Sequence, residues 1–117
     1  MVKSLLVINA DTAGSRLLYL LCLDLFGDEI QIDFVDYYKR DDLPLIQEYN
    51  SKLIISNDYR ALVHLKQAEI LSKLVYVQVD KGSVRGARGV SDESIYLDVT
   101  RPLAVFKDEL QEVINRL

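Results

Sequence analysis

The amino-acid sequence predicts a single α/β domain built on a doubly wound, five-stranded parallel sheet, in which strands and helices alternate as (βα)5 and the fourth helix is short or absent. Two observations predict this fold: five apolar runs recur along the 117 residues, and helix-like stretches lie between most of them. The length is that of one ordinary domain, and half of the residues are hydrophobic, which is enough for a core. We therefore expect one domain over residues 1–117.

The first run, SLLVINAD, contains four consecutive aliphatic residues at 5–8, as expected of a central parallel strand that is buried on both faces. A helix is predicted over residues 16–26, and Gly27 is expected to end it. The run IQIDFVD then predicts a second strand over residues 30–35.

The next helix and strand are short. Asp41 and Asp42 precede Pro44, which is the acid-then-proline pattern of a helix start, and the helix is expected to end before Asn50. Residues 53–55 are the third predicted strand.

A third helix follows, and Asn57 or Asp58 is expected to cap its start. Its apolar residues recur at helical spacing, which predicts one buried face. They are Ala61, Leu62, Leu65, Ala68 and Leu71. Residues 74–79 are the fourth predicted strand.

The segment from Lys81 to Ser91 interrupts the pattern, because it holds three of the five glycines of the chain. It is expected to be a surface loop or a frayed helix, and its glycines and two arginines also suit a phosphate cradle, so both interpretations stay open. Residues 95–99 are the last predicted strand. After Pro102 a final helix presents the apolar stripe Leu103, Phe106, Leu110, Val113, Ile114 and Leu117.

Charge and cysteine content narrow the function classes. A net charge of −4 argues against broad binding to nucleic acid, because Lys and Arg side chains drive phosphate binding. A single cysteine, Cys22, excludes an internal disulfide and a thiolate metal cluster, and we expect it to be a small buried hydrophobic residue in a reducing cytoplasm. The apolar run near the start of the sequence is too short for a signal peptide or a membrane span. We expect a cytoplasmic protein without a membrane segment.

Four predicted strands end at or just before an aspartate: Asp11, Asp36, Asp58 and Asp80. Ligands of such folds lie outside the carboxyl ends of the strands, so these side chains are a candidate Mg²⁺ cluster of a small metal-dependent phosphoesterase or nucleotide-binding domain. The alternative is that each carboxylate caps a helix or a loop. The one histidine, His64, lies inside a predicted helix and is expected to be structural.

Several stretches resemble one known family. They are SLLVINAD, Arg16-Leu17-Leu18 in a helix that ends at Gly27, Thr100-Arg101-Pro102-Leu103, and a last helix with Glu109-Leu110 and Val113-Ile114. In length and element order the whole chain resembles the receiver domain of bacterial response regulators, the signalling partners of two-component systems, with the flavodoxin/CheY-like fold. In that family an acidic pair after the first strand holds Mg²⁺, and an Asp after the third strand is phosphorylated. A Ser or Thr after the fourth strand senses the phosphate, and a Lys before a Pro neutralises it.

The resemblance places the acidic pair on Asn9 and Ala10, with Asp11 next to them, and the phospho-acceptor on Asn57, with Asp58 one residue later. Mg²⁺ requires carboxylate oxygens, and an amide is not a nucleophile for phosphoryl transfer. The family's catalytic chemistry is therefore expected to be absent.

The two remaining positions of the family's site also differ, because the hydroxyl falls near Val79 and the Lys near Arg101. We interpret the chain as a pseudo-receiver: a regulatory module that is not phosphorylated, needs no cofactor, is not an enzyme and acts through protein–protein contact. The expected partner is a second copy, in a homodimer. Family members commonly pair through the fourth helix, the fifth strand and the last helix.

The predicted helix over residues 16–26 is apolar nearly all round. A helix of this kind is usually buried on every side, and an apolar face left in water commonly marks a partner surface. Leu20 and Leu23 are therefore the candidate interface. The alternative is that a neighbouring helix, or Tyr37 and Tyr38, covers this face.

Overall fold

A computed structural model describes residues 4–9, 17–36, 38–49, 51–78, 92–97 and 102–116 of the chain. It confirms the predicted α/β fold, with a single five-stranded, all-parallel sheet in the order β2-β1-β3-β4-β5. The strands are β1 (Ser4–Asn9), β2 (Gln31–Asp36), β3 (Leu53–Ser56), β4 (Lys73–Gln78) and β5 (Glu93–Tyr96). The described helices are α1 (Leu17–Phe26), the 3-10 helix η1 (Arg40–Asp42), α2 (Leu43–Tyr49), α3 (Tyr59–Gln67) and α4 (Leu103–Asn115).

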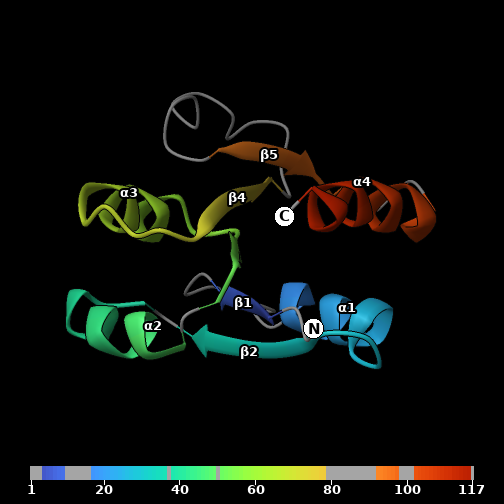
Figure 1. Cartoon of the computed structure of the whole chain (residues 1–117). Coiled ribbons are helices and arrows are strands. Elements are labelled where there is room, and N and C mark those ends of the chain that lie inside the picture. The colour runs from blue at the N-terminus through green and yellow to red at the C-terminus, as the bar shows by residue number, and fades with distance from the viewer. Residues whose placement is uncertain are drawn as a thin grey trace.

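Strand order explains how the helices are distributed. β1 pairs in parallel with both β2 and β3, so the chain runs outward from β1 to β2 and then returns across β1 to reach β3. Parallel crossovers of one hand then place their helices on opposite faces of the sheet. Figure 1 shows α1 and α4 on one face, and α2 and α3 on the other.

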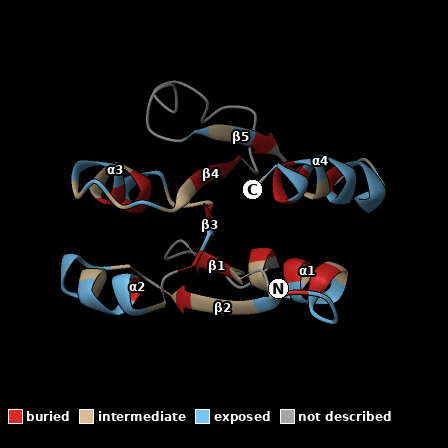
Figure 2. Cartoon of the chain, viewed as in Figure 1, coloured by how far each residue is buried: buried red, intermediate tan, exposed pale blue. Residues whose placement is uncertain are grey.

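The strands bury alternate residues against these two helical layers, as the period of two in a strand requires. In β1, Leu5 and Val7 join the core under α1 and α4, whereas Leu6 and Ile8 join the core under α2 and α3. We call these two halves the α1–α4 layer and the α2–α3 layer. The outward faces of the helices are largely exposed (Figure 2).

The structure confirms the predicted end of α1. The Gly27 amide donates to the carbonyl oxygen of Leu23 at 2.8 Å. A Cβ atom at position 27 would lie 2.3 Å from that same oxygen, so the turn requires glycine.

The predicted apolar face of the third helix was wrong in one respect. α3 ends at Gln67, and the Leu71 side chain is fully exposed. Glu69 has a φ of 55° in the left-handed region, and the Ile70 amide donates back to the Leu65 carbonyl oxygen at 3.3 Å. This turn closes the helix before the apolar spacing reaches Leu71.

The last strand begins two residues earlier than predicted, at Glu93. The Glu93 carboxylate lies 2.8 Å from the Lys73 amine on β4 and also pairs with Arg116, so a charged residue is accommodated at the strand start. The final helix is amphipathic as predicted, except that Leu103 is 46% exposed. The predicted loop from Lys81 to Ser91 and the end of the apolar stripe at Leu117 lie outside the described residues.

In the part of the chain that the structure describes, no helix has the length and apolar character needed to cross a membrane.

Candidate functional site

Two of the four strand-end aspartates, Asp36 and Asp58, are described, and the hydrogen bonds of Asp58 define its structural role. Asp58 follows β3, and its Oδ1 accepts hydrogen bonds from the amides of Arg60 at 3.1 Å and Ala61 at 3.4 Å. This is the predicted cap at the start of α3, which satisfies amides that have no partner within the helix. Asp36 is the last residue of β2.

A buried hydroxyl positions this cap. Ser56, at the end of β3, donates to the Ile8 carbonyl oxygen of β1 at 2.8 Å and accepts from the Asp58 amide at 2.8 Å. A buried polar group needs such partners, because water cannot reach it. Ser56 thus ties the end of β1 to the start of α3.

The metal cluster stays a prediction. Asp11 and Asp80 lie outside the described residues. Among the residues that are described, no group of three or more His, Cys, Asp or Glu side chains is arranged to hold a metal ion.

The positions assigned by the receiver resemblance are also only partly described. Asn9 ends β1 and is paired in register with Asp36, and Asn57 directly follows β3. Asp11, Val79 and Arg101 lie outside the described residues.

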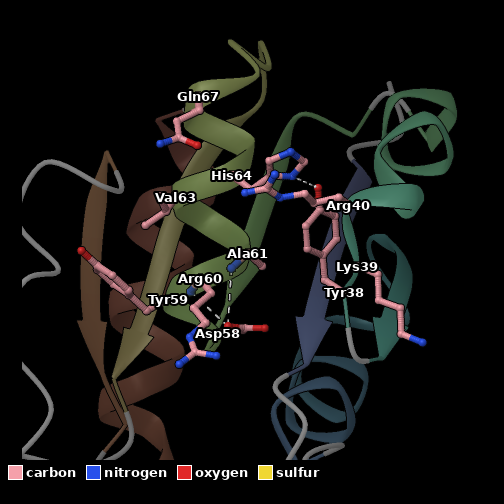
Figure 3. A pocket seen from close by; sticks show the side chains of 10 residues that line it. All are labelled: Tyr38, Lys39, Arg40, Asp58, Tyr59, Arg60, Ala61, Val63, His64 and Gln67. Carbon is pink, nitrogen blue, oxygen red and sulfur yellow. Dashed lines mark hydrogen bonds between the residues drawn. The ribbon is translucent and has the colours of Figure 1, made fainter.

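A pocket that the sequence did not predict lies in the α2–α3 layer. Residues 38–40, which follow β2, form one wall, and residues of the 58–67 stretch along α3 form the other (Figure 3). Its volume is about 710 Å³ and it is open to solvent. We call this pocket the α3 groove.

A tyrosine and the histidine connect the two walls of the α3 groove. The phenol oxygen of Tyr38 and Nδ1 of His64 share a hydrogen bond, and the two ring centroids are 5.6 Å apart. Burial raises the pKa of Tyr38, the Asp42 carboxylate raises it further, and the Arg40 guanidinium lowers it. The phenol therefore stays protonated at neutral pH.

The α3 groove is rich in positive charge. Lys39, Arg40 and Arg60 line it, all three with exposed side chains, and Asp58 is its one acidic residue. Within the described residues, none of these three cations forms an ion pair. The groove is therefore locally cationic on a chain whose net charge is −4.

The α1–α4 layer exposes apolar surface instead. The side chains of Leu20 and Leu23 on α1 are 55% and 43% exposed. Other side chains of the helix are packed: Cys22 is fully buried, and the centroid of the Tyr19 ring lies 4.2 Å from that of Phe34 on β2. Burial raises the pKa of the Cys22 thiol to about 12, so the sulfur stays protonated and unreactive.

Comparison with known proteins assigns no family to the chain. No family model matches it, and no curated protein has a significantly similar sequence.

Proposed function

We propose that the chain is a cytoplasmic, receiver-like regulatory module that is not phosphorylated and acts through contact with other proteins, first of all a second copy of itself. The observation that carries the proposal is the exposure of Leu20 and Leu23 on α1. The helix holds one charged residue, Asp24, so little on this face favours water. Association would remove both leucines from solvent.

The absence of phosphorylation is proposed from the chemistry at the end of β3. Asn57 occupies the position that the receiver resemblance gives to the phospho-acceptor, and its amide is not a nucleophile. The next residue, Asp58, already uses Oδ1 to cap α3. Incubation with acetyl phosphate and Mg²⁺ is expected to leave the intact mass unchanged. A single added phosphoryl group mapped to Asp58 would overturn this part of the proposal.

Association is tested with the double variant Leu20→Glu/Leu23→Glu. Both leucines are already about half buried in the monomer, so burying the rest of each contributes roughly half of the 1.5–3 kcal/mol of a fully exposed leucine. Two charges at these positions are therefore expected to convert the dimer to monomer. Light scattering measures the mass, and circular dichroism checks the fold. Leu71→Glu is the matched control, because Leu71 is an exposed leucine of the α2–α3 layer. Its mass is expected to equal that of the unchanged protein.

Two results would contradict this interface. If the double variant unfolds while Leu71→Glu does not, the α1 face belongs to the core of the monomer. If the double variant stays folded and keeps its mass, the partner binds elsewhere, and the surface formed by β5 and α4 becomes the candidate.

The alternative function is a metal-dependent phosphoesterase or nucleotide-binding domain that uses Asp11, Asp36, Asp58 and Asp80. A metal that binds only the folded state must raise its stability. Thermal melts with and without Mg²⁺ or Mn²⁺ separate the two functions. Our proposal expects no change in the melting temperature, and the alternative expects a rise.

A further inference from the structure

We propose that the α3 groove binds a phosphate-bearing small molecule, held by Arg40 and Arg60. The groove lies in the α2–α3 layer, so this site is independent of the proposed association through α1. It is also distinct from the strand-end positions that the receiver resemblance assigns, except for Asp58.

The shape of the groove suits a small ligand. Its volume of about 710 Å³ lies within the range of roughly 300–1,000 Å³ that small-molecule sites occupy. Val63 and the Tyr38 ring supply apolar surface on the two walls, and polar groups lie among them. This mixture is typical of a site that binds an organic molecule with one charged group.

The charge of the groove favours an anion. Its lining holds three cations and one carboxylate, and the nearby Asp42 carboxylate, which raises the pKa of Tyr38, leaves a small excess of positive charge. A phosphate monoester carries a charge of about −1.5 to −2 at neutral pH. A guanidinium group is a planar fork that matches phosphate oxygens. Figure 3 shows Arg40 reaching from the segment after β2 toward His64, and Arg60 lying near the start of α3, so the two side chains would contact different parts of the ligand.

The position of Arg60 is not explained by stability. It lies in the first turn of α3, where the helix dipole presents partial positive charge and a cation is disfavoured. Within the described residues no carboxylate pairs with it. An anion in the groove would offset the repulsion between Arg60 and the helix dipole, and it would also give Arg60 a partner of opposite charge.

Asp58 provides a contact for a second part of the ligand. Its Oδ1 caps α3, whereas Oδ2 accepts no hydrogen bond within the described residues. A carboxylate oxygen beside bound phosphate is suited to accept a hydrogen bond from a hydroxyl group. A sugar phosphate carries both groups, and it is therefore the ligand that the groove fits best.

A nucleic acid is a poorer match for the same residues. A protein that binds its backbone typically neutralises about six to ten phosphates, and the groove offers three cations on a chain of net charge −4. One phosphate group accounts for the charge that is present.

Isothermal titration calorimetry tests the proposal with inorganic phosphate, ribose 5-phosphate and uncharged ribose as probes. We expect saturable binding of ribose 5-phosphate with one site per chain, and no binding of ribose. Arg60→Gln is expected to weaken the binding about tenfold or more, because a charge-assisted hydrogen bond is lost. Lys66→Gln is the matched control: it removes one exposed cation from the same helix outside the groove, and its affinity is expected to stay unchanged.

The probes also distinguish two sources of phosphate. Tighter binding of ribose 5-phosphate than of inorganic phosphate assigns the groove to sugar phosphates, and equal binding assigns it to the free ion. Asp58→Asn keeps the cap and is expected to reduce the preference for ribose 5-phosphate.

The proposal is overturned if neither phosphate probe saturates, or if Arg60→Gln and Lys66→Gln weaken binding equally, which would indicate non-specific attraction. Circular dichroism confirms that each variant is folded. Repeating the titration with Leu20→Glu/Leu23→Glu keeps the two proposals separate, because ligand binding is expected to survive the loss of association.

Discussion

The two helical layers cover opposite faces of the same sheet with helices of different length. This difference in helix length affects which side chains each layer leaves exposed. At about 1.5 Å per residue, the 13 residues of α4 span roughly 20 Å, whereas the seven residues of α2 span roughly 10 Å. A strand of six residues, such as β2, is roughly 20 Å long. In the α1–α4 layer, α4 is therefore as long as such a strand, whereas α2 in the α2–α3 layer is about half as long.

The exposed surfaces follow from this geometry. The α1–α4 layer has apolar residues beyond those that the sheet can bury, so Leu20 and Leu23 face water. In the α2–α3 layer the segment before α2 and the first turns of α3 are left to form the α3 groove with polar side chains. We therefore propose different occupants for the two layers: a protein surface for the first and a small charged molecule for the second.

The largest expected effect tests whether the two layers unfold as one unit. Phe106→Ala in the α1–α4 layer is expected to cost about 3–5 kcal/mol of the free energy of unfolding, and Leu62→Ala in the α2–α3 layer about 2–5 kcal/mol. Both side chains are buried against the same sheet, on opposite faces. Urea unfolding followed by circular dichroism measures both. A small cost for Leu62→Ala alone would show that the α2–α3 layer contributes little to the cooperative core.

The next effect concerns the hydroxyl that links the strand ends to the α2–α3 layer. Ser56→Ala leaves the Ile8 carbonyl oxygen and the Asp58 amide without their partner, at an expected cost of about 1–3 kcal/mol. Ser94→Ala on β5 is the control, because Ser94 is exposed, and it is expected to change stability by less than about 0.5 kcal/mol. Equal costs in urea unfolding would show that Ser56 is not a structural link.

The cap of α3 is expected to have a smaller effect. Asp58→Ala removes the acceptor of two amides and is expected to cost about 1 kcal/mol, whereas Asp58→Asn keeps an acceptor and is expected to cost a few tenths at most. Thermal unfolding of the two variants measures the difference. A similar loss in both would indicate that the negative charge, and not the cap, stabilises this helix.

The smallest expected effect is a gain in stability rather than a loss, and it concerns the turn after α3. Glu69 occupies the left-handed region with a φ of 55°, where a side chain is strained, so Glu69→Gly is expected to stabilise the protein by roughly 0.5–1 kcal/mol. Glu48→Gly in α2 is the control, and it is expected to destabilise by about 1 kcal/mol, because glycine is unfavourable inside a helix. Loss of stability in both variants would contradict the strain at position 69.

The fold could be predicted because each strand and helix is specified mainly by a short stretch of sequence. The aliphatic run of β1 and the acid-proline start before α2 carry their signal within a few neighbouring residues, and the structure has both elements. The end of α3 could not be predicted, because the spacing of Leu65, Ala68 and Leu71 continues the helical period beyond the turn at Glu69. The helix ends there because Glu69 adopts a left-handed backbone conformation. Glycine or asparagine at this position would have predicted that conformation, and glutamate does not.

The α3 groove could not be predicted for a different reason. Tyr38 and His64 are 26 residues apart, and neither belongs to a recognisable motif. They meet because β1 lies between β2 and β3, which brings the segment after β2 opposite α3. Asp58 was correctly expected as a cap, because that role depends only on the residues that follow it.

Because Cys22 is buried, its reactivity can report how often the α1–α4 layer separates from the sheet. Cys22 is the single thiol of the chain, and it lies in the α1–α4 layer behind the exposed leucines. A thiol reagent can modify it only after that layer separates from the sheet, so the labelling rate in native buffer measures how often this happens. The raised pKa adds a pH dependence: as the pH rises from 9.0 toward about 12, the unfolded chain loses the proton first, and opening becomes easier.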